Sequence, residues 1–295
     1  MKVKEVLKST LDESVNFIFD NMVEARLVNR KAGYISIYVS SHTGCNKSCR
    51  MCHLTQTGQT SFDHVTADQY AAQAKVVWEY YLDNLKEDES MVDKVYINFM
   101  SRGEPFANKY ILENGNDVLE AITNVFKPSG VNVKFQISTI LPTDIEHVEL
   151  SSIFDYQKYK IDIHYSLYSL DAEFRKKWIP KSINPYKALD KLRQLQLYCT
   201  DVEITLHWAF IEGENDSMHT VVGIIDAIEE YGYSGFECKI NIVRYNPYSE
   251  NQGKESSEEV IKNNVRLINS STGVPVKIIP RVGHDVKASC GTFVY

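Results

Sequence analysis

Apolar and polar positions along the chain recur with two periods, and these predict strands and helices in a repeating order. Short runs of β-branched and aromatic residues predict strands, and apolar stripes at spacings of three and four predict helices. The predicted strands cover residues 35–39, 94–100, 131–138, 159–167, 202–211, 236–244 and 274–279. The predicted helices cover residues 66–82, 111–126, 185–198, 218–231 and 257–269.

The alternation predicts an α/β fold in two parts. Residues 1–30 are expected to form a helical extension, because Leu7, Leu11, Val15, Ile18 and Met22 recur at helical spacing. Residues 31–295 alternate strands with helices, which implies a mostly parallel sheet with right-handed crossovers. About six such units make a partial or full barrel, and ligands of such folds bind at the carboxyl ends of the strands.

Composition excludes several classes of protein. The chain has 295 residues, 43% of them hydrophobic, and no apolar run long enough to span a bilayer. Its net charge of −7 argues against broad, charge-driven binding of nucleic acid. Six cysteines without an export signal indicate a reducing compartment, so we expect the protein in the cytoplasm.

A cluster of three cysteines directly follows the first predicted barrel strand. Cys45, Cys49 and Cys52 have the spacing Cys-x3-Cys-x2-Cys. Three thiolates on one loop can hold three irons of a cubane cluster and leave the fourth iron open. An open iron is what a radical S-adenosylmethionine (SAM) enzyme needs to bind SAM. The alternative is a structural zinc site with His42 or His53 as fourth ligand, although no second Cys-x2-Cys pair is present.

Further candidate ligand-binding residues follow the other predicted strands. They are Gly103, Glu104, Ser138, Ser166, Leu167, Tyr168 and Asn215. A glycine permits close approach of backbone to ligand, and the carboxylate of Glu104 can accept hydrogen bonds from the ammonium group of SAM. Small hydroxyls suit a ligand carboxylate or ribose, and Asn215 offers both a donor and an acceptor. Each motif is weak alone, and only their shared position at the strand ends indicates a SAM site.

Taken in order, these motifs resemble the RlmN/Cfr family of radical SAM adenine methyltransferases, which act on ribosomal RNA and, for RlmN, also on transfer RNA. The resemblance extends from about residue 23 to the C-terminus. It rests on the segments 40–45, 101–105, 137–139, 165–168, 214–217, 238–248 and 281–291. Collinear agreement of this kind is more specific than any single motif.

The resemblance implies a radical SAM barrel with a 4Fe–4S cluster and SAM as cofactors. It also implies that SAM methylates Cys290 and that the methyl carbon then passes to a ring carbon of an adenine in a nucleic acid or nucleotide. Without the resemblance, Cys290 would be taken for a buried packing residue. An electron donor such as flavodoxin or ferredoxin is implied as a partner. Glu24 corresponds to the family's proton-accepting glutamate if the loop after it is one residue longer.

Departures from the family pattern leave the reaction open. Tyr38 stands where the family has the second cysteine that releases the product, and Tyr168 replaces a histidine. The family's additional N-terminal RNA-binding domain is expected to be largely absent. The sequence is therefore compatible with three functions. They are methyl transfer through Cys290 to an adenine-type base, non-methylating radical chemistry on another substrate, and a zinc-stabilised binding protein without catalysis.

Overall fold

The computed structural model describes residues 1–29, 33–85, 92–235 and 237–295. Its centre is one sheet of ten strands that lie side by side in chain order. The strands are β1 (Val3–Lys8), β2 (Val15–Phe19), β3 (Glu24–Asn29), β4 (Tyr34–Tyr38), β5 (Lys94–Phe99), β6 (Asn132–Thr139), β7 (Ile161–Ser166), β8 (Ile204–Trp208), β9 (Lys239–Ile242) and β10 (Val276–Ile278).

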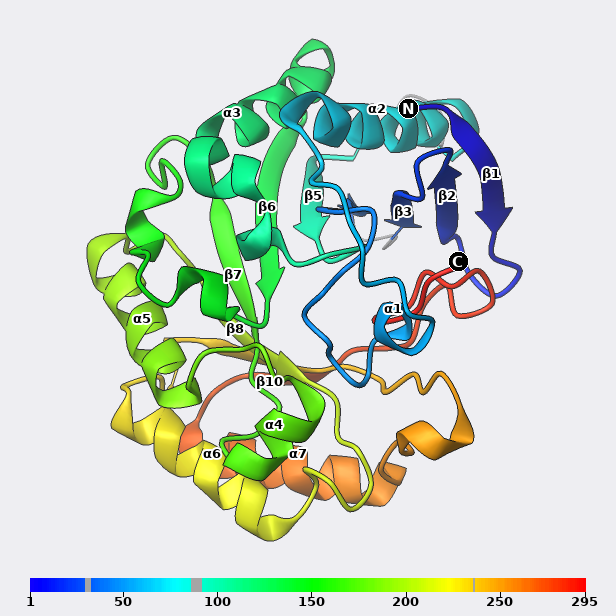
Figure 1. Cartoon of the computed structure of the whole chain (residues 1–295). Coiled ribbons are helices and arrows are strands. Elements are labelled where there is room, and N and C mark those ends of the chain that lie inside the picture. Colours follow the sequence, from blue (N-terminus) through cyan, green and yellow to red (C-terminus); the bar gives the residue numbers. More distant parts are fainter. Residues whose placement is uncertain (30–32, 86–91, 236) are drawn as a thin grey trace.

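Strands β4 to β10 pair in parallel, and the longer helices lie along the outer face of the curved sheet (Figure 1). Within the described ranges no pairing joins β10 to β1, so the barrel is partial, and the predicted α/β barrel is confirmed. The helices are α1 (His53–Gln56), α2 (Ala67–Asn84), α3 (Lys109–Phe126), α4 (Ala172–Trp178), α5 (Pro185–Tyr198), α6 (Met218–Glu230) and α7 (Glu258–Thr272). None of these described helices has the length and apolarity needed to cross a membrane.

Helix α2 shows how the sequence sets these elements. Thr66 caps its first turn by accepting from the N–H of Gln69, and the Gln69 side chain accepts from the N–H of Thr66. Ala74, Val77 and Trp78 lie on the buried face of the helix. Burial of such apolar area, at roughly 25 cal/mol per Å², is what holds a helix against a sheet.

The helical extension predicted for residues 1–30 is wrong. Strands β1, β2 and β3 pair antiparallel with one another, and β3 continues the sheet onto β4. All five residues of β2, Val15 to Phe19, are buried, which an amphipathic helix with a single apolar stripe cannot achieve. Met22 takes a left-handed φ of 69° in the turn between β2 and β3, and Leu11 is exposed. Helical spacing was therefore a coincidence in this segment.

Candidate active site

Three thiols line one wall of a cavity of about 130 Å³ at the carboxyl ends of the barrel strands. This cofactor cavity is bordered by Cys45, Cys49, Cys52, Glu104 and Cys290. Burial raises the pKa of each cluster thiol, that of Cys45 to about 12, so cation binding must release their protons. All three thiols are free, and unpaired soft thiols on one cavity fit an iron–sulfur cluster held by thiolates.

The path of the cysteine loop depends on a glycine and on backbone hydrogen bonds. The N–H of Cys45 donates to the carbonyl of Gln59 over 3.0 Å. A Cβ at Gly44 would lie 2.3 Å from the carbonyl oxygen of Ser61, so no other residue fits without moving the backbone. Ser48, between the first two cysteines, takes a left-handed φ of 60°. The loop thus turns tightly enough to present three thiols to one cavity.

The two histidines considered as zinc ligands lie elsewhere. The His42 ring is 3.0 Å from both the Ser41 hydroxyl and the His64 ring. His53 hydrogen-bonds through Nε2 to the carbonyl of Asn246 at 3.3 Å. Neither histidine lines the cofactor cavity. The structure therefore does not bring a histidine to the three cysteines as a zinc ligand.

Gly103 and Glu104, which the sequence predicts to bind SAM, both line the cofactor cavity. The Glu104 carboxylate accepts from the Thr139 hydroxyl at 2.6 Å and from the N–H of Ile140 at 3.1 Å. Burial raises the pKa of Glu104 to about 7. Gly103 has φ +96°, and a Cβ there would lie 2.4 Å from the Ser41 hydroxyl. These two residues can approach a ligand closely and offer it a positioned carboxyl group.

Of the other predicted SAM contacts, three reach the cofactor cavity and two do not. Ser138, Ser166 and Tyr168 line it. Leu167 is fully buried away from it, and Asn215 is also fully buried. Asn215 instead donates through Nδ2 to the carbonyl of Tyr168 at 3.0 Å, and Tyr168 has a left-handed φ of 56°. Asn215 therefore supports the loop that carries Tyr168.

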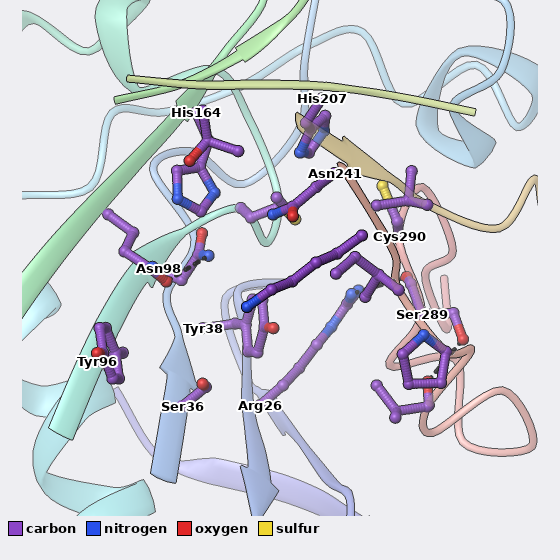
Figure 2. A pocket seen from close by; sticks show the side chains of 18 of the residues that line it. Arg26, Ser36, Tyr38, Tyr96, Asn98, His164, His207, Asn241, Ser289 and Cys290 are labelled. Carbon is purple, nitrogen blue, oxygen red and sulfur yellow. Dashed lines mark hydrogen bonds between the residues drawn. The ribbon is translucent and has the colours of Figure 1, made fainter. Parts of the chain in front are cut away.

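Cys290 lies where two cavities meet. It lines the cofactor cavity and also a larger cavity of about 440 Å³ inside the barrel (Figure 2). This barrel cavity is bordered by Tyr38, Asn98, His164, Asn241 and Cys290 among others. Burial raises the pKa of the Cys290 thiol to about 11. Tyr38 lines the barrel cavity, whereas Cys199 and Cys238 line neither cavity.

Glu24 is not in either cavity. Its carboxylate is fully buried and pairs with Arg102 at 3.0 Å and Arg26 at 3.4 Å. It also accepts from the N–H of Val294 at 3.1 Å and from the side chain of Asn16 at 3.1 Å. With these partners Glu24 joins the sheet to the C-terminal segment, and the structure does not bring it to a substrate as a proton acceptor.

The two arginines beside Glu24 are functional candidates that the sequence did not reveal. Arg26 donates to the carbonyls of Ser289, at 3.1 Å, and Thr292, at 2.5 Å, and so holds both sides of Cys290. The ring of Phe293, which lines the cofactor cavity, lies 4.9 Å from the Arg26 guanidinium and 5.6 Å from that of Arg102. Arg26 lies in none of the motifs, and an isolated arginine in a strand normally faces solvent. Arg102 lies in the segment 101–105, but the motif gave that position no role.

Comparisons with known proteins find sequence relatives of the chain. No family model matches the chain. The chain is 25% identical over 298 residues to a probable dual-specificity RNA methyltransferase RlmN of Clostridium botulinum, covering 98% of this chain and 78% of that protein. It is 25% identical over 310 residues to the ribosomal RNA large subunit methyltransferase Cfr of Staphylococcus warneri, covering 99% and 79%.

The fold has a solved counterpart. The crystal structure of a radical SAM methyltransferase from Sphaerobacter thermophilus superposes with a TM-score of 0.73 at 19% identity, covering 99% of this chain and 80% of that one. This likeness shows the fold, and the sequence matches extend over nearly the whole chain. The chain is therefore a relative of the RlmN and Cfr RNA methyltransferases and has the fold of a radical SAM methyltransferase.

Proposed function

We propose that the chain transfers a methyl group through Cys290 to a ring carbon of an adenine-type base in RNA or a nucleotide. The observation that carries this proposal is that Cys290 borders both the cofactor cavity and the barrel cavity. A residue that receives a group on one side and delivers it on the other needs such a position. The relatives are named as RNA methyltransferases, which supports the reaction class and an RNA or nucleotide substrate.

The cofactor cavity supplies the groups that the two cofactors need. Cys45, Cys49 and Cys52 would hold the cluster, and Glu104 would accept from the ammonium group of SAM. Cluster and SAM supply the methyl group and the radical chemistry, while the protein supplies orientation and exclusion of water. The reductant is included in the proposal as an external electron donor such as flavodoxin or ferredoxin.

The segment around Cys290 is held rigidly on both sides. Asn246 donates to the carbonyl of Cys290 at 3.0 Å, and the hydroxyl of Ser289 donates to the carbonyl of Val282 at 2.7 Å. Gly291 follows with a left-handed φ of 74°, which permits the turn beside the cluster loop. Positioning of this kind counts for much of catalysis, because small displacements of a reacting group can cost a hundredfold in rate.

A second candidate function is radical chemistry without methyl transfer. Tyr38 is the observation that favours it, because a tyrosine on the wall of the barrel cavity cannot form a disulfide with Cys290. Cys199 and Cys238 line neither cavity and do not replace it. Under methyl transfer, release of the product would then need an external thiol or a different base.

Mass spectrometry tests the proposal and separates the two candidates. Anaerobically purified, iron-reconstituted protein is incubated with SAM and reductant, and then analysed for a methyl group on Cys290 and for 5′-deoxyadenosine. We expect methylated Cys290, absence of this peptide modification in Cys290→Ala, and its retention in Cys199→Ala, a cysteine outside both cavities. An unmodified Cys290 with 5′-deoxyadenosine still formed would refute methyl transfer and leave the second candidate.

A further inference from the structure

A row of polar side chains crosses the barrel from the cofactor cavity to the edge strand β10. The strand register pairs Ser166 with His207, His207 with Asn241, and Asn241 with Lys277. Residues in register on parallel strands point to the same face, and here all four border one or both cavities. Because neighbouring strands are about 4.8 Å apart, Lys277 is anchored about 10 Å from His207.

Lys277 is a cation in this row without an ion-pair partner among the described residues. The barrel cavity is bordered by six basic side chains and by the carboxylates Asp162 and Glu203. The other five basic groups have ion-pair partners, as Lys134 has in Asp162 at 2.6 Å. Lys277 has no such partner among the residues that the structure describes. An unpaired ammonium at the rim of a cavity is a ready site for an anionic group of a ligand.

The middle of the row offers neutral hydrogen-bonding groups. His207 is 4% exposed and borders both cavities, and Asn241 lies beside it (Figure 2). In the described part of the chain, the ring nitrogens of His207 and the side-chain amide of Asn241 have no hydrogen-bond partner. Burial lowers the pKa of His207 to about 4, so the ring is neutral near pH 7. Asn241 is half-buried and His207 is buried, and the free amide and ring nitrogens of these cavity-lining residues can hydrogen-bond a ligand.

We propose that the barrel cavity binds a free adenine mononucleotide, with the base between His207 and Asn241 and the phosphate on Lys277. This inference rests on the proposed function, whose substrate class it narrows. The base would then lie beside Cys290, which borders the same cavity. The volume of about 440 Å³ falls within the range of about 300–1,000 Å³ that small-molecule pockets show.

Charge favours a mononucleotide over a base within a long RNA. Polynucleotide binding depends on neutralising many phosphates, and the chain carries a net charge of −7. Lys277, the one cavity lysine without an ion-pair partner in the described ranges, matches a single phosphate instead. In this row the neutral groups of His207 and Asn241 come first and the ammonium group of Lys277 lies at the edge strand. This order matches that of base and phosphate in a nucleotide.

Calorimetric titration of the cluster-reconstituted protein without reductant tests this inference. We expect adenosine 5′-monophosphate to bind about two- to fivefold more tightly than adenosine, because Lys277 is exposed and solvent screens a charge pair there. Lys277→Ala should abolish this ratio and leave adenosine binding unchanged, whereas Lys277→Arg should retain part of it. His207→Ala should weaken both ligands alike. Lys262→Ala, at an exposed lysine on α7, is the matched control and should leave the ratio intact.

Equal affinities for the nucleotide and the nucleoside would overturn the inference, and so would a preference that survives Lys277→Ala. Tighter binding of an adenine-containing oligoribonucleotide than of the mononucleotide, insensitive to Lys277, would assign the site to RNA instead. The titration involves no turnover, so its failure leaves the Cys290 methylation result standing. Conversely, Lys277-dependent nucleotide binding by a protein whose Cys290 stays unmethylated would support the site and refute the proposed methyl transfer.

Discussion

Removing the Glu24 carboxylate is expected to destabilise the protein strongly. Glu24 is fully buried between the guanidinium groups of Arg102, at 3.0 Å, and Arg26, at 3.4 Å. Glu24→Ala leaves two buried like charges without their counter-ion, and such a change costs about 3–5 kcal/mol of unfolding free energy. The N–H of Val294 also loses its acceptor, so the segment that carries Cys290 should loosen. Glu24→Gln retains a hydrogen-bond acceptor but not the charge, so its free energy of unfolding should lie between those of the native protein and Glu24→Ala.

Urea unfolding followed by circular dichroism measures this effect under anaerobic conditions. Glu79→Gln is the control, because Glu79 is more than half exposed, 3.7 Å from Lys75, and such surface pairs contribute about 0–1 kcal/mol. If Glu24→Ala lowers the free energy of unfolding no more than Glu79→Gln does, the claim that the buried Glu24 carboxylate stabilises the fold is refuted. If Glu24→Gln keeps full stability and Cys290 methylation but loses product formation, Glu24 is a proton acceptor after all, and its assigned structural role is wrong.

Three further changes test individual parts of the site. Gly103→Ala is expected to cost about 1–3 kcal/mol and to weaken SAM binding in equilibrium dialysis, because its Cβ would lie 2.4 Å from the Ser41 hydroxyl at φ +96°. SAM binding should weaken roughly tenfold as pH falls from about 8 to about 6, because burial raises the pKa of Glu104 to about 7 and the protonated carboxyl loses its attraction for an ammonium group. This pH dependence should vanish in Glu104→Gln. A pH dependence that remains in Glu104→Gln would contradict the role of Glu104 in binding the ammonium group. Arg175→Lys should lower the free energy of unfolding in urea by at least about 2 kcal/mol, since the buried guanidinium donates to the carbonyl of Leu167 at 2.9 Å and to several other groups. Surface changes usually stay within about ±0.5 kcal/mol, so a loss of stability below about 0.5 kcal/mol would show that these bonds contribute little.

Residues local to one segment could be predicted from the sequence. The spacing of Cys45, Cys49 and Cys52 placed three thiols on one loop, and the structure brings them to one cavity. Gly103 and Glu104 were predicted at a strand end and lie in the same cavity. Both predictions needed only the rule that the carboxyl ends of parallel strands share one edge of a sheet. Helix α2 could likewise be predicted from the sequence, because its cap and its apolar stripe lie within one segment.

Contacts between distant segments were decided by the tertiary structure alone. Val15 and Ile18 fit a helical stripe by spacing, but pairing with the neighbouring strands buries all five residues of β2 in a sheet. Glu24 was predicted to act in the reaction, yet its carboxylate pairs with Arg26 of its own strand and with Arg102 from the loop after β5. The meeting of two cavities at Cys290, and the row that ends at Lys277, depend on strand register across the barrel. Spacing along one segment fixes its local geometry, whereas register and burial arise only when segments far apart in the chain pack together.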